Sequence, residues 1–151
     1  MLKDSSSPQR VVVNATPLLG NLTGVGQVTA TIARYLENRD DFQLKFHTPF
    51  RTYGSVEEVC SPLLELRLAR RAKQIFQRLP FKENLRRILT QVHATQEVYD
   101  AYWEPNFIPL KTIEARHVIT TVHDMSFREY PEWHPADRVN FFAQNFARNI
   151  D

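Results

Sequence analysis

Short apolar runs recur along the chain and predict β-strands. The first contains Val11–Val13, three β-branched residues in a row, which is typical of a strand buried on both faces. The second alternates apolar and polar residues, which favours a shorter strand nearer a sheet edge. In chain order, the predicted strands cover residues 10–15, 42–46, 99–103 and 117–122.

Segments with helical periodicity lie between these strands. Val28, Ile32 and Leu36, for example, recur every four residues after the first strand. Strands that alternate with helices indicate βαβ units, so the sequence predicts an α/β fold, a Rossmann-like parallel sheet flanked by helices. In chain order, the expected helices cover residues 25–38, 62–79, 82–94 and about 135 onward.

Length and composition fit one globular domain. The 151 residues, 42% of them hydrophobic and 24% charged, suffice for one core. The polar, Ser-rich residues 1–9 predict a flexible tail, and residues 10–151 form the predicted domain. Because another strand of a doubly wound sheet is expected after the last helix, we expect this domain to be incomplete and the full protein to be longer.

The sequence favours a cytoplasmic location. It contains no run of about 18 apolar residues and no apolar signal segment after Met1. The single Cys60 cannot form an internal disulfide, which fits a reducing compartment.

Positive charge is concentrated between Ser61 and Thr90, where eight Lys and Arg residues accompany two Glu residues. Arg67, Arg71 and Arg78 flank an apolar stripe at helical spacing, an arrangement that suits an anionic membrane surface or a protein partner. A solvated helix face explains the same pattern. Few aromatic residues are interleaved with these charges, so nucleic acid is not expected as a partner. One interpretation is therefore a non-catalytic binding module that docks on a partner, or peripherally on the inner face of the membrane, through basic helices over 61–94.

Candidate site residues follow the predicted strands, because ligands of parallel α/β sheets bind beyond the carboxyl ends of the strands. After the first strand, Gly24, Val25, Gly26 and Gln27 open a helix, where small residues and free N–H groups suit a phosphate. A turn that simply needs two small residues explains these glycines equally well. Pro105 and Asn106 close the third strand.

His123 and Asp124 follow the fourth strand and are the candidate catalytic pair. A histidine at a strand end can donate a hydrogen bond or take a proton near neutral pH. Asp124 can orient that histidine, accept from a hydroxyl group, or cap the turn before Ser126. The nearby aromatics Tyr130 and Trp133 can stack on a ligand ring or cover the core, and we favour core cover.

Other nucleotide and metal sites are not expected. Thr29 stands at the third glycine position of a dinucleotide fingerprint, and no Gly-Lys-Ser/Thr of a Walker loop occurs. His117 and His134 lack the spacing of metal ligands. A nucleotide-binding enzyme of another α/β family is the remaining, weaker interpretation.

Three segments carry a resemblance to a known family. They are Asn14–Leu18 continuing through Thr23–Gly26, then Tyr102–Pro109, and then Val118–Phe127 with Tyr130–Glu132. In this order they resemble the N-terminal domain of family 4 glycosyltransferases, the retaining group with the two-domain GT-B fold, and in particular its mannosyltransferases. One difference is that Gln27-Val28 stands where the family often has Arg-Tyr, so a cationic phosphate contact is either missing or supplied elsewhere.

The resemblance implies transfer of a hexose, with retention, from a nucleotide-sugar such as GDP-mannose or a UDP-sugar. The implied acceptor is a polysaccharide or lipid-linked glycan, as in lipopolysaccharide synthesis. His123 is expected to contact the hydroxyls of the donor sugar, with Asp124 in support, and the Gly24–Gly26 loop to pass near the donor phosphates or the acceptor. Neither a metal nor another cofactor is implied. A C-terminal donor-binding domain is implied as the other half, without which the chain is expected to be inactive.

Overall fold

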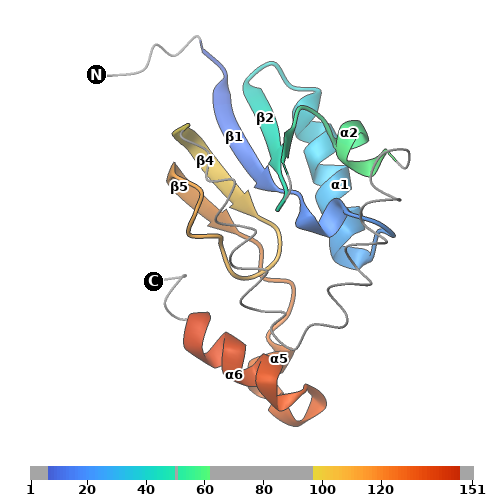
Figure 1. Ribbon diagram of the computed structural model, residues 1–151, viewed down its shortest axis with the longest axis vertical. Coiled ribbons are helices and arrows are strands. Elements are labelled where there is room, and N and C mark those ends of the chain that lie inside the picture. Colours follow the sequence, from blue (N-terminus) through green and yellow to red (C-terminus); the bar gives the residue numbers. More distant parts are fainter. Residues whose placement is uncertain (1–6, 50, 62–96, 147–151) are drawn as a thin grey trace.

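The computed structural model describes residues 7–49, 51–61 and 97–146. A five-stranded sheet lies at its centre, with the spatial order β3-β2-β1-β4-β5 (Figure 1). Strands β1, β2, β4 and β5 are parallel, and β3 runs antiparallel to β2. This mostly parallel sheet with flanking helices confirms the predicted α/β, Rossmann-like fold. The strands span Gln9–Asn14 (β1), Phe42–His47 (β2), Thr52–Tyr53 (β3), Tyr99–Glu104 (β4) and Ala115–Thr120 (β5).

Strand β1 occupies the position that its apolar run predicted. It pairs with β2 on one side and β4 on the other, and Val12 and Val13 have no exposed surface. Strand β2, expected nearer an edge, is covered by β3 through the pair Phe46↔Tyr53. We did not predict β3, because two residues are too few to show an alternating pattern.

Strand β5 differs from its prediction in both position and burial. It ends at Thr120, so His123 follows the strand by three residues rather than directly. Val118 and Ile119 are exposed, and in the part of the chain that the structure describes β5 pairs only with β4. An apolar run in an edge strand therefore gave the same pattern as a buried one.

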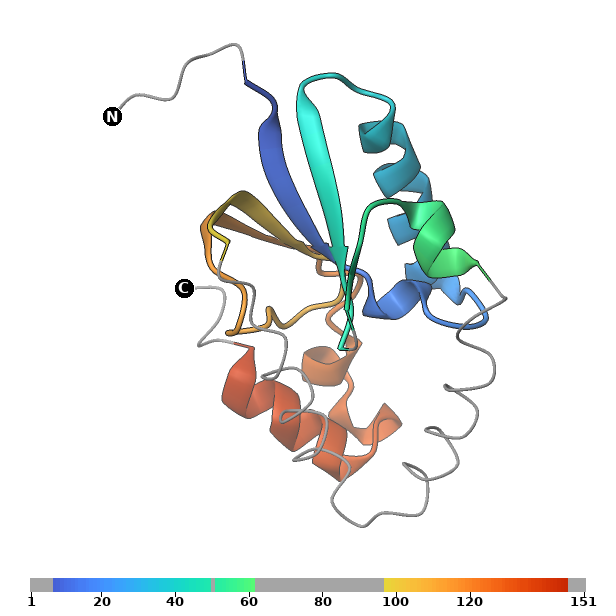
Figure 2. The same cartoon turned by 45° about the horizontal axis from the view of Figure 1, so that its top comes forward.

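Helix α1 (Gly24–Glu37) was located correctly, but of the three residues that revealed it only Leu36 packs against the core. Val28 and Ile32 are exposed, whereas small side chains such as Ala30 and Ala33 face the core. Small residues let a helix lie close to a sheet, and here that closeness decides which side is buried. Helices α1 and α2 (Val56–Cys60) cover the same face of the sheet (Figure 2).

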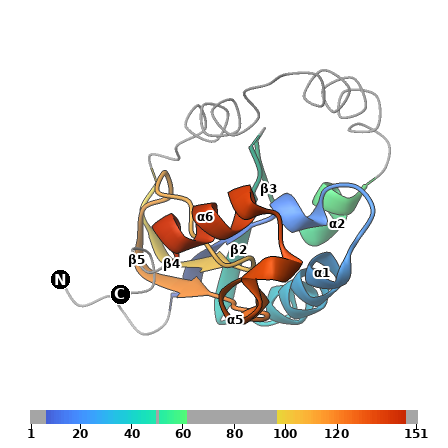
Figure 3. The same cartoon turned by 90° about the horizontal axis from the view of Figure 1, so that it is seen from below.

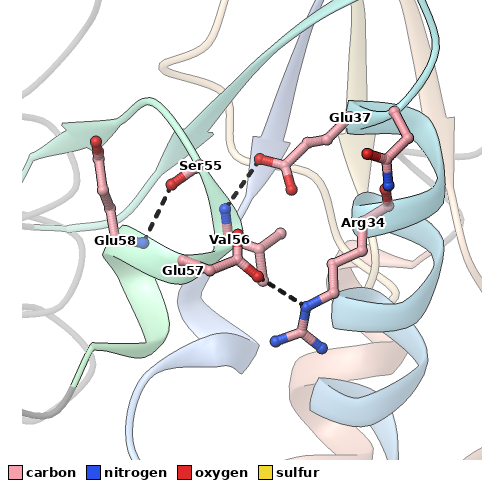
Figure 4. Close-up of polar contacts among 7 residues, drawn as sticks. Arg34, Glu37, Ser55, Val56, Glu57 and Glu58 are labelled. Atoms are coloured by element: carbon pink, nitrogen blue, oxygen red, sulfur yellow. Dashed lines mark hydrogen bonds and ion pairs between the residues drawn. The ribbon is translucent and has the colours of Figure 1, made fainter.

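Polar contacts fasten α2 to α1, as Figure 4 shows. The Val56 N–H donates to Glu37 Oε1 (3.0 Å), and Arg34 Nε donates to Glu57 Oε1 (3.0 Å). The Ser55 hydroxyl oxygen accepts from the Glu58 N–H (3.2 Å) and so caps the helix start. Val56 and Val59 complete the contact by entering the core.

The other two α-helices of the described ranges lie beyond the carboxyl ends of the strands. Figure 1 places α5 (Ser126–Glu129) and α6 (Ala136–Asn145) below β4 and β5, and Figure 3 shows them nearest the viewer, in front of the sheet. Phe107, Phe127 and Phe142 form a buried aromatic cluster that joins these helices to the segment after β4. The expected helix after residue 135 is thus confirmed up to Asn145. Two single turns of 3-10 helix complete the described elements, η1 (Thr16–Leu18) and η2 (Pro131–Trp133).

Candidate functional site

The carboxyl ends of the parallel strands lie side by side. Asn14 of β1 pairs with His47 of β2, and Glu104 of β4 pairs with Thr120 of β5. The chain leaves β1 for β2 on one side and later returns to place β4 on the other. The junction between β1 and β4 is therefore a topological switch point, the place where α/β sheets bind ligands.

A buried polar bridge, consisting of Asn14, Tyr102 and Glu104, closes this junction. Asn14 Nδ2 donates to Glu104 Oε2 (2.8 Å), and the Tyr102 hydroxyl donates to the same oxygen (2.6 Å). Glu104 is only 1% exposed. A buried carboxylate needs donors around it, and these side chains supply them.

The polar bridge also fixes the loops that follow its strands. Glu104 Oε1 accepts from the Asn106 N–H (3.0 Å), and Asn14 Oδ1 accepts from the Thr16 N–H and hydroxyl (3.1 and 2.7 Å). Sequence reasoning missed Asn14 as a site residue, and it placed Glu104 in the candidate turn before Asn106 without giving it a role. The available signal was a polar residue directly after each buried apolar run.

Burial raises the pKa of the Tyr102 hydroxyl far above its usual range, and the neighbouring Glu104 carboxylate raises it further. Because the folded pKa exceeds the unfolded one, the stability that Tyr102 contributes is complete below about pH 10 and is lost as the pH rises further, toward the folded pKa. We expect Tyr102→Phe to lose less stability than the wild type between about pH 8 and about pH 11, measured by urea unfolding. An unaltered slope in Tyr102→Phe would contradict the assignment.

The two glycines at the start of α1 have different roles. A Cβ on Gly26 would lie 2.6 Å from the Pro17 carbonyl oxygen, so this glycine lets η1 pack against the helix. A Cβ on Gly24 would meet nothing within 4 Å. The interpretation that the turn simply needs a small residue therefore holds for Gly26. Gly24 leaves the backbone open at the helix start, and next to it Val25 is half-buried and Gln27 is exposed.

The turn after β4 is held in an unusual conformation. Pro105 is buried and Asn106 exposed, and Phe107 adopts a φ of 65°, which is uncommon for a residue with a side chain. Packing of Phe107 in the aromatic cluster stabilises this conformation against its cost of about 1–3 kcal/mol. The turn thus presents Asn106 in a fixed position beside the switch point.

His123 is exposed and joined to this turn. Its Nε2 lies 2.8 Å from the Pro105 carbonyl oxygen, and its ring meets the Phe107 ring edge-on. A carbonyl oxygen only accepts, so Nε2 carries a proton and Nδ1 is the acceptor of the neutral ring. His123 is therefore oriented by the segment after β4, with Nδ1 as its second polar atom.

Asp124 caps a turn, one of the three roles considered for it. Its Oδ1 accepts from the Ser126 N–H (2.9 Å) and hydroxyl (2.6 Å), and these bonds hold the pKa of Asp124 below its usual range. Among the described residues, no hydrogen bond joins it to His123, so the orienting role finds no support.

The Ser126 hydroxyl connects Asp124 to His134. Since its proton goes to the ionised carboxylate, His134 Nε2 donates to Ser126 Oγ (2.9 Å). His134 is therefore a donor here and not a base, and Ser126 is not activated as a nucleophile. This geometry argues against a serine hydrolase at this position.

The aromatics after α5 were interpreted wrongly. Tyr130 and Trp133 were expected to cover the core, but they are 44% and 68% exposed. Their rings stack on each other with centroids 4.3 Å apart. Phe107, Phe127 and Phe142 fill the core beneath this segment, which leaves Tyr130 and Trp133 at the surface.

The remaining expectations concern the predicted basic helices, a metal site and a membrane-spanning helix. The structure describes Ser61 but not the rest of the predicted basic helices over 61–94. The prediction for Arg67, Arg71 and Arg78 therefore lies outside the described residues. In the described ranges, no group of three or more His, Cys, Asp or Glu side chains is placed to hold a metal ion. No helix there is long and apolar enough to cross a membrane.

Comparison with known proteins adds no relative: no family model matches the sequence, and no significant match was found among curated proteins or solved structures. The resemblance to family 4 glycosyltransferases therefore stays a prediction from the sequence motifs.

Proposed function

We propose that this chain forms the acceptor-side wall of a retaining hexosyltransferase, which moves a hexose from a nucleotide-sugar to a polysaccharide or lipid-linked acceptor. One observation carries the proposal. Strands β1, β4 and β5 are neighbours in the sheet, and the segments after their carboxyl ends lie around the switch point. These segments hold, in the same order, the open start of α1, the Asn106 turn and His123. These are the segments on which the motif resemblance rests.

The proposed chemistry uses groups that the described geometry leaves accessible. The free N–H groups at the start of α1 favour the donor phosphates, and Nδ1 of His123 pairs with a hydroxyl of the donor sugar. The acceptor hydroxyl oxygen bonds to the anomeric carbon as the bond from that carbon to the phosphate oxygen breaks. The departing phosphate takes the hydroxyl proton, so the products are the glycosylated acceptor and a nucleoside diphosphate. We propose that a C-terminal donor-binding domain holds the nucleotide opposite this wall.

His123→Gln tests the catalytic assignment. A glutamine amide N–H can still donate to the Pro105 carbonyl, but the side chain lacks Nδ1. We expect transfer by the protein, expressed at the full length that its gene encodes, to fall about 100-fold through loss of the hydrogen bond to the donor sugar, with little change in stability. The measurement is consumption of GDP-mannose or UDP-hexoses in the presence of lipid-linked and polysaccharide acceptors.

His117→Gln is the matched control, because His117 is an exposed histidine within β5, the strand that precedes His123, and lies away from the carboxyl edge. It should transfer at the wild-type rate. Equal rates for His123→Gln and the wild type would remove His123 from the chemistry. If the wild-type protein consumes no nucleotide-sugar with any acceptor, the proposed function is wrong.

A further inference from the structure

The stacked pair Tyr130 and Trp133 is built into a stiff segment. Their rings are nearly parallel, at 10° to each other. The backbone N–H of Trp133 donates to the Tyr130 carbonyl (3.0 Å), and the backbone N–H of Tyr130 donates to the Ser126 carbonyl (2.8 Å). Pro131 restricts the turn between the two aromatics. A large aromatic surface is thus held in place although it faces solvent.

The pair is also connected to the candidate site. Trp133 is followed by His134, which donates to Ser126, and Ser126 in turn donates to Asp124. The two hydrogen bonds that Ser126 donates to Asp124 both go to Oδ1, and within the described residues no hydrogen bond reaches Oδ2. Asp124 is exposed, so its carboxylate can accept hydrogen bonds from hydroxyl groups of a bound molecule.

The surroundings of the pair favour a neutral, hydroxyl-rich ligand. The exposed charged residues nearby in the chain carry both signs, which suits neither a strongly anionic nor a strongly cationic partner. A hydroxyl group donates a hydrogen bond to a carboxylate and accepts one from a guanidinium group. The apolar C–H face of a sugar ring packs against an aromatic face. These charged residues are Arg128, Glu129, Glu132, Asp137 and Arg138.

We propose that Trp133, backed by the stacked ring of Tyr130, offers its outer face as a stacking platform for a hexose ring of the acceptor glycan, with Asp124 accepting hydrogen bonds from the hydroxyls of that hexose. This inference rests on the proposed function for the identity of the ligand as acceptor. The platform itself is a carbohydrate-binding surface that can be tested without transfer.

Tryptophan fluorescence provides the binding test. Within these 151 residues Trp103 is buried and Trp133 is 68% exposed, so the part of the acrylamide quenching that Trp133→Phe removes from the full-length protein reports on Trp133. We expect mannose and glucose di- and trisaccharides to protect the protein from quenching in a saturable way. Asp124→Asn should weaken this protection, and Tyr35→Ala, which removes an exposed aromatic from α1, should leave it unchanged.

Acceptor kinetics provide the second test. Trp133→Ala in the full-length protein should raise KM for the acceptor about tenfold while kcat and KM for the nucleotide-sugar stay within about twofold. Tyr35→Ala should change none of these constants. Absence of protection by every saccharide, together with an unchanged acceptor KM in Trp133→Ala, would overturn the platform while leaving transfer intact. Protection by saccharides without any transfer would support the platform and refute the proposed function.

Discussion

Replacing Glu104 by Gln is expected to destabilise the folded protein by about 3 kcal/mol. Both carboxylate oxygens accept hydrogen bonds, from Tyr102, Asn14 and the Asn106 N–H, and the residue is buried. A glutamine directs an NH2 group at one of these donors, which leaves polar hydrogens without an acceptor inside the core. Urea unfolding followed by circular dichroism measures the change.

Glu114→Gln is the control for this loss, since Glu114 is an exposed acidic residue that immediately precedes β5. Its effect should stay within about 0.5 kcal/mol. Similar losses for the two variants would show that the polar bridge does not hold the carboxyl ends of β1 and β4 together.

Gly26→Ala should cost about 2 kcal/mol, whereas Gly24→Ala should be neutral or stabilising by up to about 1 kcal/mol. At Gly26 the new methyl group would lie 2.6 Å from the Pro17 carbonyl oxygen, a backbone atom that moves only if η1 shifts. At Gly24 the methyl group meets open space, and alanine favours the helix. The two variants make the same chemical change two residues apart, so each serves as the control for the other.

Unfolding curves of both glycine variants measure this difference. Equal losses at the two positions would contradict the close approach of η1 to α1. A stable Gly26→Ala variant with unchanged η1 contacts would do the same.

The sequence predicted those parts of the fold that depend on local pattern. Val11–Val13 identified the central strand, and the four-residue recurrence of Val28 and Ile32 located α1. The same recurrence could not show which side of α1 is buried, because that depends on how closely Ala30 and Ala33 approach the sheet. Likewise, the apolar run in β5 could not reveal its exposure, which follows from its position at the sheet edge.

The candidate site was predictable only in part. His123 and Asn106 were identified because strand ends in parallel sheets gather at one edge, and the strand pairing supports that rule here. The hydrogen bond between Asn14 and Glu104 was not predicted, because both residue types also suit turns and their contact depends on the order of the strands in the sheet. The exposure of Trp133 was missed because three phenylalanines occupy the core position assigned to it.

The polar bridge also bears on the kinetics of folding. Asn14 and Glu104 are 90 residues apart in the chain, so their hydrogen bond requires that β4 already lie beside β1. Contacts that close such long loops form late, after local helices and turns. An interaction absent from the folding transition state slows unfolding with little effect on folding. The bridge at the switch point is therefore expected to prolong the lifetime of the folded state more than it speeds the formation of that state.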